Sequence, residues 1–395
     1  MSIVVKGGLV FLGSKFEKKD ILIEDDRIVA IGTDLKAEKS LDASGMLVLP
    51  GLIDPHVHLR EPGETYKEDF VTGSRAAIAG GFTTVIDMPN NKLPTITKAR
   101  YDEKIELAKK AKCDILFHFG GTDDNFDEVK KTNPQSMKIY LGETTGRMFL
   151  LDPSSLEKHF ALFPKDRPIV LHISDHSEDE EKNLAKTYDT LQKTLILAKK
   201  YDRRIHIAHV STKKEMQIAA KYEKCTTEIA PHHLFLSTKD QKRLGPFAKV
   251  YPPLRSEQQR LMLWSVLEKV DCIATDHAPH PIEDKEAGAA GFAGLETSLA
   301  LMLKGCNDDL LDKIWLVDRM SANVAHIFGL PKKGKIQKGN LADIILVDPK
   351  KEWTVVGSEL ETKCHWSPFD GMKLKGKVHT VIKSGKVVYE DYEFV

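Results

Sequence analysis

A regular alternation of short apolar runs and longer polar stretches through the middle of the chain limits the fold more than any other feature. The apolar runs are rich in β-branched residues and predict buried strands, whereas stretches such as ARYDEKIELAKKAK and TYDTLQKTLILAKKY predict helices. Strands that alternate with helices predict a parallel sheet, because a helical crossover returns the chain to start each parallel strand. The apolar runs, in chain order, are MLVLPGLID, TTVIDM, DILFHFG, MKIYLG, PIVLHIS, RIHIAHV, TTEIA and CIATD.

The number of these runs predicts an α/β fold of the (β/α)8 TIM-barrel type. The length of 395 residues accommodates a barrel of about 250 residues together with a second, smaller unit. An open doubly wound sheet is the alternative that the count alone leaves open. No GxGxxG motif follows the first run, and this disfavours the dinucleotide-binding form of such a sheet.

Both ends of the chain show a different pattern, in which short strands are separated by turns. IVVKGGLVF and DILIEDDRIVAIG lie near the start, and NLADIILVD, EWTVV and the hairpin GKVHTVIKSGKVVYED lie near the end. Because the termini of a domain tend to lie close together, we predict one small β-sandwich domain built from residues 1–50 and 335–395. The barrel would then occupy residues 51–334. Two unrelated β appendages are the alternative.

Composition narrows the classes of partner. The chain has 58 Lys and Arg residues against 58 Asp and Glu residues, so we expect no basic surface that would bind nucleic acid or membrane. We expect a small-molecule substrate instead. Its five cysteines are widely spaced and form no Cys-x-x-Cys pair, which fits a reducing compartment. With no signal peptide and no apolar run long enough to span a bilayer, a cytoplasmic protein is predicted. A net charge of zero leaves association unopposed, so a homodimer is compatible with the sequence.

Polar side chains occur at or near the ends of the predicted barrel strands. Since the C-terminal strand ends of a barrel meet at one mouth, we expect residues from position 56 to position 276 to converge there. These residues are His56, His58, Asn90, Lys138, His172, His209 and Asp276.

The residue types in this set are those of a metal site. His56 and His58 are two residues apart on a strand, so alternation directs both imidazoles to the same face. His172 and His209 each close an apolar strand, and Asp276 ends another, where a buried carboxylate needs a cation or several donors. A lone His-x-His or a lone core histidine is a weak signal, but the combination favours a metal centre. His206 is the competing candidate to His209, which we prefer because it lies nearer the end of its strand.

Lys138 in MKIYLGETTG is the candidate for a bridge between two ions. An ammonium group cannot bind a metal, but a neutral lysine amine that adds CO2 becomes a carbamate with one oxygen for each ion. An ordinary ion-paired lysine is the alternative that spacing leaves open. Imidazole and carboxylate ligands favour Zn²⁺ over Mg²⁺ or Ca²⁺.

Six motifs in order give these residues a family resemblance. PGLIDPHVHLREPG, IDMPN, KIYLGETTG, EIAPHHLFLS, ATDHAPH and GFAGLETSL together resemble the dihydroorotases of the amidohydrolase superfamily, in the branch that carries a carboxylated lysine. The resemblance implies two zinc ions per chain, bridged by carboxylated Lys138. The first zinc would be held by His56, His58, Lys138 and Asp276, and the second by Lys138, His172 and His209.

The same resemblance implies a hydrolase acting on cyclic amides. Its reaction would be the reversible cyclisation of N-carbamoyl-L-aspartate to L-dihydroorotate in pyrimidine (UMP) biosynthesis, with Asp276 as general base and then acid. The substrate carboxylate would be bound by Arg60, Asn90 and His280, Thr144 would belong to a loop over the substrate, and residues 291–297 would offer backbone groups. Arg60 favours a carboxylate-bearing substrate, because guanidinium and carboxylate pair through two hydrogen bonds.

Three alternatives remain open beside this interpretation. The chain could be an allantoinase or another cyclic amidohydrolase, a non-catalytic scaffold of the same fold, or a subunit that needs a carbamoyltransferase partner. It also departs from the family at two places. Tyr251 stands where relatives have Asn or Arg, so either Arg255 compensates or the tyrosine points away. Ala208 stands where some relatives have a cysteine that binds a third zinc, although Glu228 is present.

Overall fold

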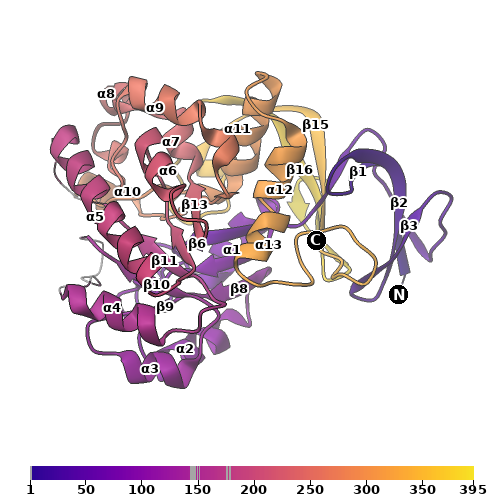
Figure 1. The fold of residues 1–395 in the computed structure, drawn as a ribbon. Helices are drawn as coiled ribbons and strands as arrows, with labels where there is room; N and C mark the ends of the chain where they lie inside the picture. Colours follow the sequence, from indigo (N-terminus) through magenta and orange to yellow (C-terminus); the bar gives the residue numbers. More distant parts are fainter. Residues whose placement is uncertain (1, 143–147, 149, 151, 175–176, 178) are drawn as a thin grey trace.

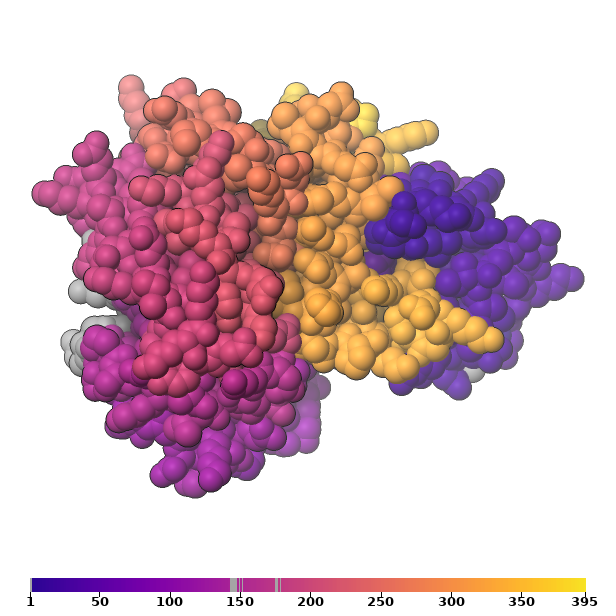
Figure 2. Space-filling view, in the orientation of Figure 1, coloured from indigo at the N-terminus to yellow at the C-terminus, as the bar shows by residue number. Residues whose placement is uncertain are grey.

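The computed structural model describes residues 2–142, 148, 150, 152–174, 177 and 179–395, and Figure 1 traces their course. Strands from both ends of the chain share one mixed sheet, ordered β18-β17-β16-β15-β5-β1-β2-β3, with β4 paired to β1. The indigo atoms of the N-terminal segment form a lobe at one side of the molecule, next to orange atoms of later residues (Figure 2). The strands of this sheet are β1 (Ser2–Phe11), β2 (Phe16–Glu24), β3 (Arg27–Gly32), β4 (Lys39–Asp42), β5 (Leu47–Pro50), β15 (Ile344–Thr354), β16 (Lys373–Lys383), β17 (Lys386–Glu390) and β18 (Glu393–Phe394).

The junction between the two ends of the chain is the antiparallel pair β5–β15, in which Leu49 lies opposite Ile345. The turn of the β16–β17 hairpin has Ser384 and Gly385 both at positive φ, as the SGK motif predicts for a tight hairpin. NLADIILVD and EWTVV, expected as two strands, belong to the single strand β15, whose pairing is irregular between Asp348 and Glu352. A composite unit made from both termini is compatible with this sheet.

The middle of the chain forms parallel strands, which confirms the α/β class. One sheet is ordered β6-β7-β8 and the other β14-β13-β12-β11-β10-β9, and only His118 separates β8 from β9. A parallel bridge between Val57 and His277 links the end of β6 to the segment after β14, as closure of a barrel requires. These strands are β6 (Leu52–Val57), β7 (Phe82–Asp87), β8 (Asp114–Phe117), β9 (Phe119–Gly120), β10 (Met137–Tyr140), β11 (Ile169–His172), β12 (Ile205–Ile207), β13 (Cys225–Ile229) and β14 (Cys272–Ile273).

Helices lie outside these strands (Figure 1). They are α1 (Phe70–Ala79), α2 (Lys98–Ala108), α3 (Phe126–Thr132), α4 (Pro153–Leu162), α5 (Glu180–Lys200), α6 (Lys213–Ala219), α7 (Pro231–Phe235), α8 (Gln241–Leu244), α9 (Glu257–Trp264), α10 (Ile282–Glu286), α11 (Leu295–Asn307), α12 (Lys313–Arg319) and α13 (Ala322–Ile327). None of those described combines the length and apolarity that crossing a bilayer requires.

Helix α5 illustrates how sequence pattern sets these elements. Asp179 caps its start by accepting the backbone N–H groups of Glu181 and Lys182. Leu184, Leu191 and other apolar residues recur at helical spacing on its buried face, and this face packs into the main hydrophobic core. Apolar side chains therefore pack the strands against the surrounding helices. The C-terminal ends of the strands carry the polar groups.

Candidate active site

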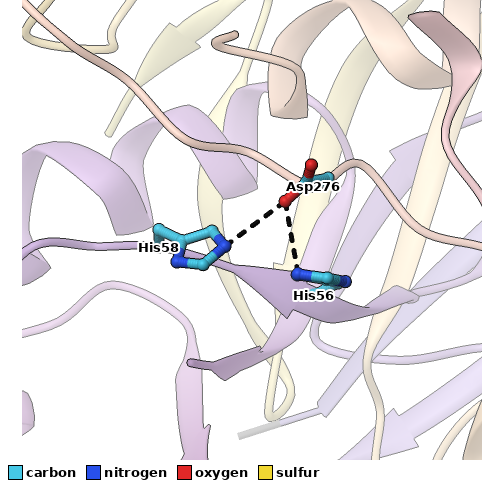
Figure 3. Close-up of side chains that lie close together, drawn as sticks. All are labelled: His56, His58 and Asp276. Carbon is cyan, nitrogen blue, oxygen red and sulfur yellow. Dashed lines mark ion pairs between the residues drawn. The ribbon is translucent and has the colours of Figure 1, made fainter. Parts of the chain in front are cut away.

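His56, His58 and Asp276 meet at the C-terminal ends of β6 and β14 (Figure 3). Asp276 Oδ1 lies 3.2 Å from His56 Nε2 and 3.3 Å from His58 Nε2. These three residues form a group whose donor atoms are close enough to hold one metal ion. The Asp54 carboxylate joins the two strands beneath them, since it accepts the backbone N–H groups of His56 at 3.0 Å and Thr275 at 3.2 Å.

His172 and His209 lie beside this group. The His172 Nδ1 atom is 2.8 Å from His209 Nε2, and the rings of His209 and His56 have centroids 5.2 Å apart. Burial, together with the positive charge of nearby groups, lowers the pKa of His56, His58 and His209, so that all three imidazoles are neutral near pH 7. Neutral imidazole is the form that binds a metal.

Lys138 is fully buried on β10, and its Nζ atom has no hydrogen-bond partner among the described residues. Burial lowers the pKa of this amine to about 8, against the opposing charges of Glu228 and Asp276. Burial of the ammonium is unfavourable, so a larger fraction of this amine is neutral near pH 7 than for an exposed lysine. The neutral amine is the form that reacts with CO2.

The predicted carboxylate-binding residues lie next to the histidines. Arg60 is 3% exposed, and its Nη2 atom is 2.9 Å from His280 Nε2. Asn90 Oδ1 lies 2.8 Å from His58 Nδ1. Arg60 and Asn90 line the same cavity as His56, His172 and Asp276. Thr144, predicted in a loop over the substrate, lies outside the described residues.

The structure shows the surroundings of Tyr251 and Arg255, whose roles the sequence left open. Tyr251 lines the cavity of the histidines. Arg255 instead donates from Nε to Ser211 at 3.0 Å and from Nη1 to Asn183 at 2.8 Å. Gly291, at the start of the expected backbone-contact segment, also lines the cavity, and a Cβ there would lie 2.4 Å from the carbonyl oxygen of Ala278. Only glycine fits this close approach.

Sequence reasoning gave no site role to two further residues. Tyr140, two residues after Lys138 on β10, lines the cavity, and its hydroxyl has no hydrogen-bond partner among the described residues. Glu228 on β13 contacts His56 Nδ1 and reaches the backbone of His209. Glu228 stood out in the sequence only through the third-zinc comparison, whereas the KIY spacing on a strand directs Tyr140 to the same face as Lys138 and was the available signal.

The donor set fits a divalent metal ion. It combines neutral imidazoles, one carboxylate and a buried lysine amine that lacks a hydrogen-bond partner among the described residues. Imidazole and carboxylate donors are those of transition-metal sites rather than of all-oxygen Mg²⁺ or Ca²⁺ sites. The residues present are therefore suited to a catalytic metal.

Comparison with known proteins identifies the class. The amidohydrolase family model matches residues 47–388, and the chain belongs to that family. Within it, the chain groups with the dihydroorotases. It is 40% identical to the dihydroorotase of Pyrococcus horikoshii over all of its own length and 94% of the relative's, and 34% identical to that of Methanosphaera stadtmanae over 94% of its own length and 92% of the relative's.

Two other comparisons add context. The L-hydantoinase (dihydropyrimidinase) of Arthrobacter aurescens superimposes with a TM-score of 0.94 and 30% sequence identity, over 100% of this chain and 97% of the other. The multifunctional protein CAD of Squalus acanthias is 36% identical over 94% of this chain, and the matched part is 16% of that protein. The fold is thus shared with a hydantoinase, and a region similar to this chain also occurs inside a larger protein.

Proposed function

We propose that this chain is a zinc-dependent dihydroorotase, which interconverts N-carbamoyl-L-aspartate and L-dihydroorotate in pyrimidine biosynthesis. The observation that carries this proposal is the meeting of His56, His58 and Asp276 with a buried arginine in one cavity. The identity of 40% to a dihydroorotase over the whole chain supports the same reaction.

We assign two zinc ions to the cavity. His56, His58, Lys138 and Asp276 would hold one ion, and Lys138, His172 and His209 would hold the other, with Lys138 carboxylated as the bridge. When bound, such a pair lowers the pKa of a water molecule from about 16 toward about 7 and polarises the ring carbonyl. The neutral imidazoles, and a Lys138 amine with no hydrogen-bond partner in the described part of the chain, support this assignment.

The protein's own groups then bind the substrate and move one proton. Arg60 pairs with the substrate carboxylate, and Asn90 and His280 hold the other side of that group. In ring opening, Asp276 accepts a proton from the attacking water and delivers it to the ring nitrogen as the C–N bond breaks. In ring closure the carbamoyl nitrogen bonds to the side-chain carboxyl carbon, and one water leaves.

The direct test is ring closure by purified protein supplied with zinc and bicarbonate. We expect N-carbamoyl-L-aspartate to be consumed and dihydroorotate to form, and we expect chelator-treated protein or Asp276→Asn to be inactive. Hydantoin, dihydrouracil and allantoin, offered in parallel, should turn over far more slowly. Absence of turnover with two zinc ions bound would contradict the proposal, and allantoin as the best substrate would favour the allantoinase alternative.

Arg60 provides the test of substrate class. Hydrogen bonds to a charged group contribute about 1.5–3 kcal/mol, so Arg60→Ala should lower kcat/KM for dihydroorotate by about 10- to 150-fold. The zinc content, measured by elemental analysis, should stay unchanged. An equal loss of zinc and activity would show that Arg60 supports the structure instead.

We also propose the finer organisation of the molecule. Residues 1–50 and 335–395 would form a β-sandwich domain around a barrel of residues 51–334. All five cysteines are free, which suits a cytoplasmic enzyme. A homodimer, or a complex with a carbamoyltransferase, would appear as an increased mass when the protein alone or the mixture is analysed by light scattering.

A further inference from the structure

Glu228 is a buried carboxylate beneath the proposed metal centre. It lies on β13 and is 1% exposed. One carboxylate oxygen contacts His56 Nδ1 and also accepts the backbone N–H of His209 at 3.1 Å. The other oxygen lies 3.0 Å from His206 Nε2. The carboxylate therefore connects residues of β6, β12 and the turn that follows β12.

The contact with His56 determines which ring nitrogen carries the proton. An ionised carboxylate only accepts hydrogen bonds, so the nitrogen facing Glu228 must be the donor, Nδ1–H. The lone pair is then on Nε2, the atom 3.2 Å from Asp276 and directed to the proposed metal. A carboxylate behind a metal-binding histidine fixes both tautomer and ring orientation in this way.

The contact with His209 acts through the backbone. His209 has φ 37°, a left-handed conformation that residues other than glycine seldom adopt. The hydrogen bond from its N–H to Glu228 holds this turn, which directs the imidazole toward His172 and His56. One side chain thus positions a proposed ligand of each metal ion.

His206 and Cys272 define the competing interpretation. Together with Glu228 they form a second group with donor atoms close enough for a metal ion. However, His206 Nδ1 is 2.8 Å from the Thr226 hydroxyl and its Nε2 faces the carboxylate, so both ring nitrogens already have protein partners. The Cys272 thiol lies 4.0 Å from His206 Nε2 and 3.9 Å from the carbonyl oxygen of Thr227. Hydrogen bonds account for this group without an ion.

We propose that Glu228 is a positioning residue of the metal centre, which fixes the Nδ1–H tautomer of His56 and the turn at His209, with His206 as its anchor. This inference rests on the proposed zinc site. It adds to that site a residue that binds neither metal nor substrate.

The experiment compares Glu228→Gln with Glu215→Gln. Glu215, 2% exposed on α6, is also a buried carboxylate, but among the described residues its hydrogen bonds come from Ser211 and Thr212 and from no histidine. In Glu228→Gln an NH2 donor replaces one of the two accepting oxygens, so whichever histidine faces the NH2 group must change its tautomer or lose its hydrogen bond. We expect its zinc affinity, measured by chelator competition, to fall about 10- to 100-fold. Glu215→Gln should keep the affinity of the unmodified protein.

Two spectroscopic readouts separate positioning from a general structural role. Cobalt-substituted Glu228→Gln should show altered d–d bands, and long-range ¹H–¹⁵N spectra should lose the Nδ1–H form of His56, while thermal unfolding remains cooperative. Unchanged zinc affinity and an unchanged His56 tautomer would overturn the inference. An extra metal ion per chain that Cys272→Ala removes would also overturn it, because Glu228 would then be a ligand.

These measurements are independent of catalysis. If the protein binds zinc in a Glu228-dependent manner but does not close N-carbamoyl-L-aspartate, the proposed function fails and the positioning role stands. If unmodified protein binds no zinc at all, both fail.

Discussion

Three residues at the site have backbone conformations that side chains other than glycine seldom adopt. Arg60, His209 and Asp276 have φ values of 65°, 37° and 49°. Such conformations cost of order 1–3 kcal/mol each and persist where surrounding contacts hold them. Each of the three comes directly after or shortly beyond a barrel strand, so the left-handed turn directs its side chain into the mouth of the barrel.

Lys138 supplies the sharpest prediction at this scale. Lys138→Ala removes the amine assigned to the proposed bridge, so the variant should bind fewer than two zinc ions. Since metal ions contribute several kcal/mol to the transition state, kcat should fall about 1000-fold or more. Elemental analysis and a ¹³C carbamate signal after labelling with bicarbonate would measure the two effects.

A rescue experiment serves as the control for Lys138→Ala. A small carboxylate such as propionate has two oxygens and should partly restore zinc content and activity by entering the vacated space. A variant that retains two zinc ions and normal turnover without any additive would show that the lysine is not the bridge.

The sequence predicted which residues meet at the site better than it predicted the groups that each of them contacts. Topology determines that residues at parallel strand ends meet, and this brought together His56, His172 and Asp276 from separate runs. The surroundings of Tyr251 and Glu228 depend on turns and on side chains from other strands. Neither pattern nor spacing encodes these, so the inward position of Tyr251 and the contacts of Glu228 required coordinates.

At the scale of elements, a buried ion pair between β7 and α2 supports the loop that carries His58 and Arg60. Lys104 Nζ is 2.5 Å from Asp87 Oδ2, and both side chains are fully buried. Asp87 Oδ1 accepts the backbone N–H of Leu59 at 2.7 Å, between the two functional residues. A helix on the outside of the strands is thus connected to the site through one carboxylate.

Breaking this pair should be costly. Lys104→Met leaves the Asp87 carboxylate buried without its cation, and we expect the free energy of unfolding to fall by about 3–5 kcal/mol. The double variant Lys104→Met/Asp87→Asn should lose less than the sum of the single changes. Urea unfolding measures all three, and a loss below about 1 kcal/mol in Lys104→Met would contradict a role for the pair.

The order of strands and helices was largely predictable from the sequence. The exact residues that belong to each element were not. Each apolar run of the middle covers all or most of at least one strand, because such runs between helix-forming stretches have few other ways to bury themselves. MLVLPGLID covers β5 and the start of β6, and DILFHFG covers β8 and β9. His232 and His233, which follow the apolar run TTEIA, belong to the short helix α7 that begins at Pro231. Proline at the first helical position is favourable, and the apolar residues around the histidines obscured that signal.

At the scale of the whole molecule, a network of four charges joins the strands of the middle to the terminal sheet. Asp114 of β8 lies 2.5 Å from Lys333 Nζ and 3.0 Å from Lys383 Nζ. Both lysines also contact Asp343, at 2.7 Å and 3.1 Å. Residues distant in sequence therefore link the two parts of the structure electrostatically.

This network predicts a pH dependence of stability. Burial opposes ionisation of Asp114, but the charges of Lys333 and Lys383 outweigh it and lower its pKa below the ordinary value of 3.8. A carboxylate with a lowered folded-state pKa stabilises the fold above the unfolded-state pKa, and this stabilisation is lost as the pH falls through the lower, folded-state value. We expect Asp114→Asn to unfold at a higher pH than the unmodified protein during acid titration.

Exposed Asp127 on α3 provides a matched control, because Asp127→Asn makes the same chemical change on an exposed helix. Circular dichroism during acid titration would compare the variants at low and high salt. If Asp114→Asn and Asp127→Asn unfold with the same midpoint pH, the network does not contribute to stability in acid.

The pairing of β5 with β15 has a consequence for how the protein is made. Pro50 ends β5 and Leu52 begins β6, so the strand that carries His56 is anchored by residues 344–347. Gly51, between the two strands, also donates its N–H to the carbonyl of Asp343 at 2.8 Å. A ribosome must therefore synthesise the chain through residues 344–347 before β5, which directly precedes β6 in the sequence, receives its β15 partner. A product terminated before these residues would leave the strand of His56 without this support.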